Sequence, residues 1–355
     1  MNDNYRRSLS GLGLSVRPRS GLGLADSGLL SPKPSGFLPF NGLGTSLNLE
    51  NAILPSLSQP HWKAVRQRFE VFHRNLALPP RQVQDGRTKI AGIVSYLNRV
   101  YYKIHSETKN SFPVGSRAKN TAIRPPRDAD IYFLLPVEVY CRIKDHKGNK
   151  QSALLQEIKR YLAISYPNTE ISGDGQVVVV NFDSYRVEVI PAFELATLGR
   201  YLICDTHNGG SYKKTAPLEE LKMIEMADLA NAGNLRPLIR MLKAWQAECS
   251  VPIKPFHLEL IAIEFMAQSP WRLKDWFYFD WITRDFFEFL YHRANQRVFL
   301  PGTFEPIPLG DDWQSRAASA YHHAAQACSF EYHNLINEAG EKWQKIFGSE
   351  IPRFL

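Results

Sequence analysis

Cysteine is scarce in this chain, and its placement excludes several classes of protein. The 355 residues include four cysteines, which lie far apart with no Cys-x-x-Cys pair and no Cys/His cluster: Cys141, Cys204, Cys249 and Cys328. Neither a structural zinc site nor a disulfide framework is therefore indicated. We expect a protein of the reducing cytoplasm.

Long apolar runs are missing as well. Even the stretch from 258 to 266 contains Glu259 and Glu264, so no segment has the length and apolarity of a membrane span. The first residues also lack the apolar core of a signal peptide. These absences predict a cytoplasmic protein without a membrane partner.

Basic residues outnumber acidic ones, 43 Lys and Arg against 35 Asp and Glu, and give a formal net charge of +8. A positive chain favours polyanionic ligands, either nucleotides or nucleic acid. The length is sufficient for a large core and for two domains. Composition thus permits a nucleotide-handling protein without identifying one.

Residues 1–58 differ in composition from the rest. The sequence Ser-Gly-Leu-Gly-Leu occurs at 10–14 and again at 20–24, amid Pro and Ser. Such a segment is too poor in periodic hydrophobic residues to form a core of its own, which predicts a flexible tail. The alternative is a docking segment for a partner protein, with its leucines filling a groove.

Beyond the tail, hydrophobic periodicity predicts an α+β fold. Amphipathic helices are expected at about 65–76 and 90–101, the second leading directly into a Gly-Ser turn. From Pro217 onward the pattern is mostly helical. A helix is expected to end near Ser165. Strands are predicted at about 129–136, 176–182 and 185–190, and a hairpin turn is predicted at 173–175.

The most informative motif combines a Gly-Ser turn with paired aspartates. Gly115 and Ser116 offer backbone N–H groups and a hydroxyl to phosphate oxygens. Asp128 and Asp130 open a predicted strand, and their i, i+2 spacing places both carboxylates on one face while the apolar residues between and after them line the other. Together these elements predict a nucleotidyltransferase active site.

A third carboxylate is expected from a neighbouring valine-rich strand. Glu188 alternates with Val187 and Val189 and can therefore reach the same open face. Asp183 is the rival, but it lies between two strand-like runs, where Asp mostly makes turns. Three converging carboxylates suit two divalent ions roughly 3.5–4 Å apart.

Later segments connect this motif to a known family. The segment 208–217 is similar to a Gly-Gly-x-Trp-x-x-Thr-Asn-Pro motif, 239–245 to an Arg-x-x-Lys-x-Trp helix, and 253–259 to the segment that follows it. From about Trp62 to the C-terminus, the chain resembles the polymerase beta-like nucleotidyltransferases. Within them it is most similar to the bacterial relatives of cyclic-GMP-AMP synthase and oligoadenylate synthase.

The resemblance implies an architecture and an activity. It implies a nucleotidyltransferase core at 59–215, with a mixed sheet and a long spine helix, and a helical domain at 216–355 that closes the nucleotide cleft. It also implies a template-independent enzyme that makes a cyclic di- or trinucleotide second messenger from NTPs in antiphage defence. The resemblance further implies that catalysis depends on two bound Mg²⁺ ions, or on Mn²⁺ in their place. Further partners would be an effector that binds the product and a regulatory protein or nucleic-acid activator.

The resemblance also implies which side chains contact the nucleotide. Lys243 matches the family's triphosphate-contacting lysine, on a helix face shared with Arg236 and Arg240 that is otherwise expected to be solvated. Tyr212 replaces the family's usual Trp, so its ring would stack on a base or pack between the domains. Lys213 would meet phosphate, or simply be solvated.

Two departures from the family pattern leave alternatives open. Glu188 stands where the family usually has Asp, and the extra methylene moves the carboxylate by on the order of 1.5 Å. Pro255 stands where a Ser often contacts the triphosphate. These departures leave open a weakened or inactive protein that binds nucleotides or nucleic acid. A separate alternative is an enzyme that extends RNA ends, which would use the same carboxylates.

Overall fold

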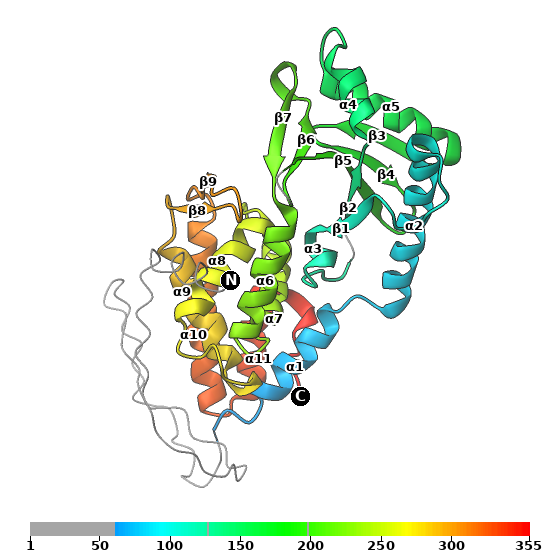
Figure 1. Ribbon diagram of the computed structural model, residues 1–355. Coiled ribbons are helices and arrows are strands. Elements are labelled where there is room, and N and C mark those ends of the chain that lie inside the picture. Colours follow the sequence, from blue (N-terminus) through cyan, green and yellow to red (C-terminus); the bar gives the residue numbers. More distant parts are fainter. Residues whose placement is uncertain (1–60, 126–127, 197–198) are drawn as a thin grey trace, which may run out of the picture. The chain divides into compact units, whose positions relative to one another are not determined.

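A mixed β-sheet organises the first half of the computed structural model, which describes residues 61–125, 128–196 and 199–355 (Figure 1). The predicted tail, residues 1–58, lies outside the described residues. Within them the sheet has seven strands, in the order β1-β2-β5-β4-β3, with β6 and β7 continuing from β5. The strands are β1 (Ser111–Val114), β2 (Asp128–Leu134), β3 (Glu170–Asp174), β4 (Val177–Asn181), β5 (Arg186–Glu194), β6 (Tyr201–Asp205) and β7 (Ser211–Thr215).

The parallel pairing of β2 with β5 is the feature that positions the site. All other strand pairs in this sheet are antiparallel. A parallel pair needs a crossover connection, and here α4 (Val137–Lys144), α5 (Lys150–Ser165) and the β3–β4 hairpin supply it. The helix expected to end near Ser165 and the three expected strands are confirmed within a few residues.

Alternating side chains attach this sheet to its helices. Ala129, Ile131 and Phe133 of β2 are buried, as the strand pattern predicts. They share a hydrophobic cluster with Ile93 and Leu97 of α2 (Pro80–Tyr102), the long helix beside the sheet in Figure 1. The apolar face of β2 therefore leaves its aspartates on the opposite, open face.

The path from α2 to the Gly-Ser turn differs from the prediction. The helix begins earlier than expected because Pro80, with its fixed φ, is favoured in a first helical turn. It ends at Tyr102, and the next residue, Lys103, has a left-handed φ of 57°. The prediction that α2 leads directly into the turn is wrong, since β1 comes between them and pairs antiparallel with β2.

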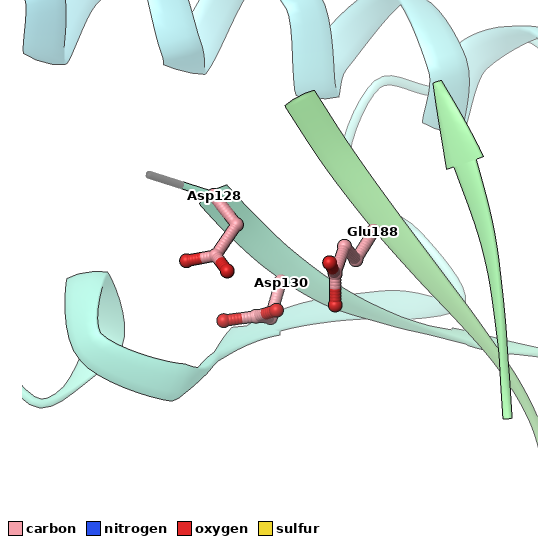
Figure 2. Close-up of side chains that lie close together, drawn as sticks. All are labelled: Asp128, Asp130 and Glu188. Atoms are coloured by element: carbon pink, nitrogen blue, oxygen red, sulfur yellow. The ribbon is translucent and has the colours of Figure 1, made fainter. Parts of the chain in front are cut away.

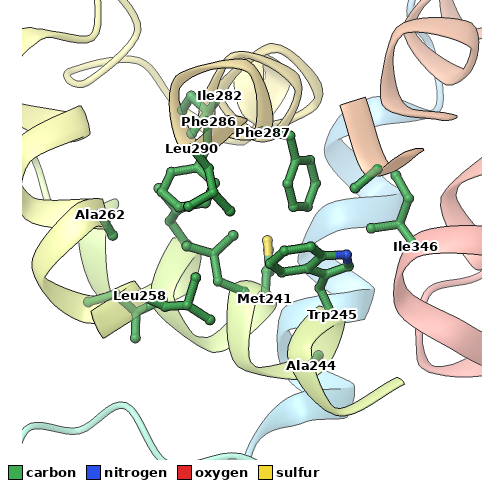
Figure 3. Close-up of a cluster of buried hydrophobic side chains, with 14 of the residues drawn as sticks. Met241, Ala244, Trp245, Leu258, Ala262, Ile282, Phe286, Phe287, Leu290 and Ile346 are labelled. Atoms are coloured by element: carbon green, nitrogen blue, oxygen red, sulfur yellow. The ribbon is translucent and has the colours of Figure 1, made fainter. Parts of the chain in front are cut away.

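Helices form the second half of the chain around a shared apolar core. Figure 3 shows part of it, where Trp245 packs among Phe287, Met241 and Ile346. Each fully buried side chain of this size contributes about 1.5–3 kcal/mol. The helices are α6 (Pro217–Ala230), α7 (Leu235–Glu248), α8 (Pro255–Gln268), α9 (Phe279–Tyr291), α10 (Gln314–Tyr332) and α11 (Ile336–Phe347), with the short hairpin β8 (Arg297–Phe299) and β9 (Pro306–Pro308).

The first helix packs with this second half. In α1 (Val65–Leu76), Phe69 and Phe72 are fully buried, and their rings lie 5.1 Å and 4.8 Å from those of Trp343 and Phe347. The sequence prediction grouped this helix with the sheet. Among the described residues, no helix is both long and apolar enough to cross a membrane.

Candidate active site

Three carboxylates meet where β2 and β5 run side by side. The parallel register pairs Asp130 with Glu188. Asp128, Asp130 and Glu188 each offer one oxygen, and these oxygens all lie within 4.8 Å of one another. Figure 2 shows the three side chains turned toward a common space. Asp183, the rival, is exposed in the turn between β4 and β5, so the structure groups Glu188 with the aspartates.

The cluster is electrostatically strained as it stands. Burial raises the pKa of Asp130 to about 7, and the neighbouring charges of Asp128 and Glu188 add to this effect. Burial and Asp128 also raise the pKa of Glu188, which Arg186 partly opposes. A bound cation would relieve this repulsion. Carboxylate oxygens are hard ligands that suit Mg²⁺ or Mn²⁺, so the residues present fit the implied metal.

Gly115 is required by its contact with Asp130. Its φ of +65° is left-handed, and a Cβ at this position would lie 1.9 Å from Oδ2 of Asp130. Only glycine, which has no Cβ, can adopt this left-handed conformation so close to the Asp130 carboxylate. Gly115 begins the short helix α3 (Gly115–Ala118), which also carries Ser116. The Gly-Ser turn thus lies directly against the carboxylates.

A cavity of about 750 Å³ joins these groups to the helical half of the chain. Its size is within the usual range for small-ligand sites. Six of the eight predicted site residues line it: Gly115, Ser116, Asp128, Asp130, Glu188 and Lys243.

Lys243 reaches the cavity wall from α7 and is already engaged. The residue is 7% exposed. Its Nζ atom donates to Oε1 of Glu259 at 2.6 Å and to Oγ1 and O of Thr121 at 2.9 and 3.2 Å. Burial lowers the pKa of Lys243, against the opposing charge of Glu259. To bind a phosphate oxygen, Lys243 would exchange one of these bonds.

A second buried lysine was missed by sequence reasoning. Lys119 also lines the cavity. Its Nζ lies 3.0 Å from Glu259 and 3.1 Å from Glu220. Burial lowers the pKa of Lys119, but the two carboxylates outweigh it and the net shift is upward. The available signal was its position one helical turn after Ser116.

Arg236 and Arg240, which share the basic face of α7 with Lys243, do not line the cavity and do not form a solvated stripe. Nε of Arg236 donates to the carbonyl of Lys119 at 3.0 Å, and Nη2 of Arg240 donates to that of Asn120 at 2.9 Å. Lys243 continues the series at Thr121. Three residues at i, i+4 and i+7 thus bind three consecutive residues that follow α3.

Two predicted nucleotide contacts lie outside the cavity lining. Tyr212 of β7 packs against Tyr140 and Phe193, with ring centroids 5.7 and 6.3 Å apart, so these ring contacts lie within the sheet half and not between the domains. Nζ of Lys213 pairs with Asp205 at 2.6 Å. The structure does not bring either residue to the carboxylates.

Comparison with known families agrees with this geometry. Residues 64–227 match the Second Messenger Oligonucleotide or Dinucleotide Synthetase domain. The matched segment contains the three carboxylates, Gly115 and Ser116, and the predicted family resemblance is confirmed.

Individual relatives are distant. A probable cyclic nucleotide synthase of Bacillus cereus is 24% identical over 216 residues, which span 56% of this chain and 62% of the relative. CdnC of E. coli MS115-1, solved with ATP, is 18% identical, with a TM-score of 0.59 over 81% of this chain and 98% of its own. CdnG of Bradyrhizobium diazoefficiens, solved with GTP, is 13% identical, with a TM-score of 0.60 over 83% and 96%. At such identities the likeness shows the fold, which confirms the polymerase beta-like α+β architecture.

Proposed function

We propose that this protein is a metal-dependent, template-independent nucleotidyltransferase that joins NTPs into a cyclic di- or trinucleotide second messenger. The observation that carries the proposal is the carboxylate triad on β2 and β5, open to a cavity that Ser116 and Lys243 also line. The second-messenger synthetase domain supports the same chemistry. The alternative of extending RNA ends would use the same acids.

The proposed site residues would have distinct roles in the reaction. Asp128, Asp130 and Glu188 would hold two divalent ions, which neutralise triphosphate charge and lower the pKa of the attacking ribose hydroxyl when bound. Glu188 would also help take the proton from that hydroxyl, since a positioned carboxylate can act as a general base. The hydroxyl oxygen then bonds to the α-phosphorus as the bond to pyrophosphate breaks.

The leaving group needs holding as well. Ser116 Oγ and the backbone N–H groups at the start of α3 would bind the β- and γ-phosphates. Lys243 would join them after releasing Thr121 or Glu259. A second round, in which the linear product attacks its own remaining triphosphate, closes the ring. The predicted roles of Tyr212 and Lys213 would require a move from their present contacts, so we do not include them.

We further propose a signalling role in antiphage defence in the cytoplasm, with the product passed to an effector. A solved complex of E. coli CdnC with HORMA-deltaN, 17% identical with a TM-score of 0.58, pairs a similar fold with another protein. That precedent supports a regulatory protein partner here.

The proposal is tested by incubating purified protein with all four NTPs and Mg²⁺ or Mn²⁺. We expect small products that resist phosphatase and that mass spectrometry identifies as cyclic. Asp128→Asn should remove them, whereas Asp183→Asn, a matched change at an exposed turn, should not. Extended RNA, or no product with either metal, would refute cyclic synthesis.

A further inference from the structure

Arg186 places a positive charge directly beside the proposed metal ligands. It begins β5 opposite Asp128 in the parallel register. Its Nη2 atom lies 3.1 Å from Oε1 of Glu188 and 3.5 Å from Oδ2 of Asp128. The guanidinium therefore bridges two of the three carboxylates, one on each strand.

Strand geometry produces this bridge. Arg186 and Glu188 are two residues apart on β5 and share a face, and the register puts Asp128 on that face too. The Arg186 side chain is 49% exposed, so water screens the interaction and the ion pair is weak. Such a bridge opens readily when a stronger cation arrives.

Formal charges show what the guanidinium changes. Three ionised carboxylates and one guanidinium together carry minus two, which a single divalent ion neutralises. A second ion would leave the site positive until a triphosphate supplied negative charge. Without the guanidinium, the site would still be negative after the first ion, and the second would bind more easily.

We propose that Arg186 is the resident counter-cation of the metal-free site. It lowers the affinity of the triad for free divalent ions and so makes full occupation depend on the nucleotide. The inference rests on the proposed function, because it requires the triad to hold metal. Arg186 acts here through the carboxylates rather than on the reacting atoms.

The test is a titration with Mn²⁺ alone at pH 8, in which electron paramagnetic resonance follows the free ion. Arg186→Gln removes the charge and keeps a polar side chain that can still donate hydrogen bonds. It should bind Mn²⁺ about tenfold more tightly, since a unit charge and a divalent ion a few ångströms apart in a water-exposed site repel by roughly that factor. With a saturating non-hydrolysable ATP analogue, the difference should shrink to about two- to threefold.

Two further variants isolate the cause. Arg186→Lys keeps the charge and should bind Mn²⁺ like the wild type. Arg142→Gln is the matched control, because Arg142 is also exposed and paired with a carboxylate, Glu157 at 2.7 Å, but lies outside the cavity lining. It should leave Mn²⁺ binding unchanged.

The outcomes separate the two proposals. Wild-type binding with no tightening in Arg186→Gln would overturn this inference alone, as would equal tightening in Arg186→Lys. Tightening that is as large with the analogue as without it would overturn the nucleotide dependence. Failure of both wild type and Arg186→Gln to bind Mn²⁺ would refute the metal-dependent function and this inference with it.

Discussion

Replacing Asp130 by asparagine should make the metal-free protein more stable. Burial, with the charges of Asp128 and Glu188, raises the pKa of Asp130 from 3.8 to about 7. The pKa of Asp130 is higher in the folded protein than in the unfolded chain. Below pH 3.8 the carboxyl is protonated in both states, so it does not affect the free energy of unfolding. The native state loses stability as the pH rises from there to 7, and the loss is complete above pH 7.

The size of the effect follows from the shift. At 1.36 kcal/mol per pKa unit, a shift of about three units costs the folded state on the order of 4 kcal/mol above pH 7. Asparagine carries no charge, and its amide can donate to Glu188 as the protonated acid does. We expect Asp130→Asn to recover about 2–4 kcal/mol, which corresponds to a rise of several degrees in Tm for a chain of this length.

Thermal unfolding with EDTA at pH 5 and pH 8 measures this. The advantage of Asp130→Asn over wild type should be smaller at pH 5 than at pH 8. In a separate titration without EDTA, this variant should no longer bind Mn²⁺. Asp183→Asn serves as the control at an exposed turn and should change Tm by little at either pH. A less stable Asp130→Asn protein at pH 8, or an advantage independent of pH, would refute the assignment of a strained acid cluster.

Three further substitutions test the site in turnover and binding assays. Gly115→Ala should reduce turnover by more than tenfold in a protein that still folds, because its Cβ would displace the Asp130 carboxylate; turnover near wild type would show that the contact is not needed. Glu188→Gln should nearly abolish turnover, whereas Glu188→Asp should retain much of it. If Glu188→Gln were the more active of the two variants, Glu188 would not be a metal ligand. Lys243→Ala should weaken NTP binding by about 1.5–3 kcal/mol in calorimetry and lower Tm, because Glu259 loses a buried partner; unchanged affinity with a lowered Tm would leave Lys243 a structural role only.

The carboxylate triad could be predicted because strand periodicity is local. The i, i+2 spacing of Asp128 and Asp130 determines their common face wherever the strand lies, and Glu188 follows from the same alternation. Lys119 and Glu259 could not be paired in advance, since they are 140 residues apart and meet only through tertiary packing. Tyr212 and Lys213 were assigned by motif, but neither face of β7 contributes to the cavity lining, and a motif does not show how far from the cavity its strand lies.

The bonds between α7 and the residues after α3 have a mechanical consequence. Three basic side chains of α7 donate hydrogen bonds to the carbonyls of residues 119 to 121, in the segment that continues from Ser116. The three donors are Arg236, Arg240 and Lys243. Ser116 and Lys243 come from different halves of the chain, yet these hydrogen bonds connect the segments that carry them, so we expect the two segments to move together. Any hinge that widens the cavity must therefore lie elsewhere. A substitution on α7, remote in sequence from the Gly-Ser turn, would shift the proposed phosphate-binding groups together.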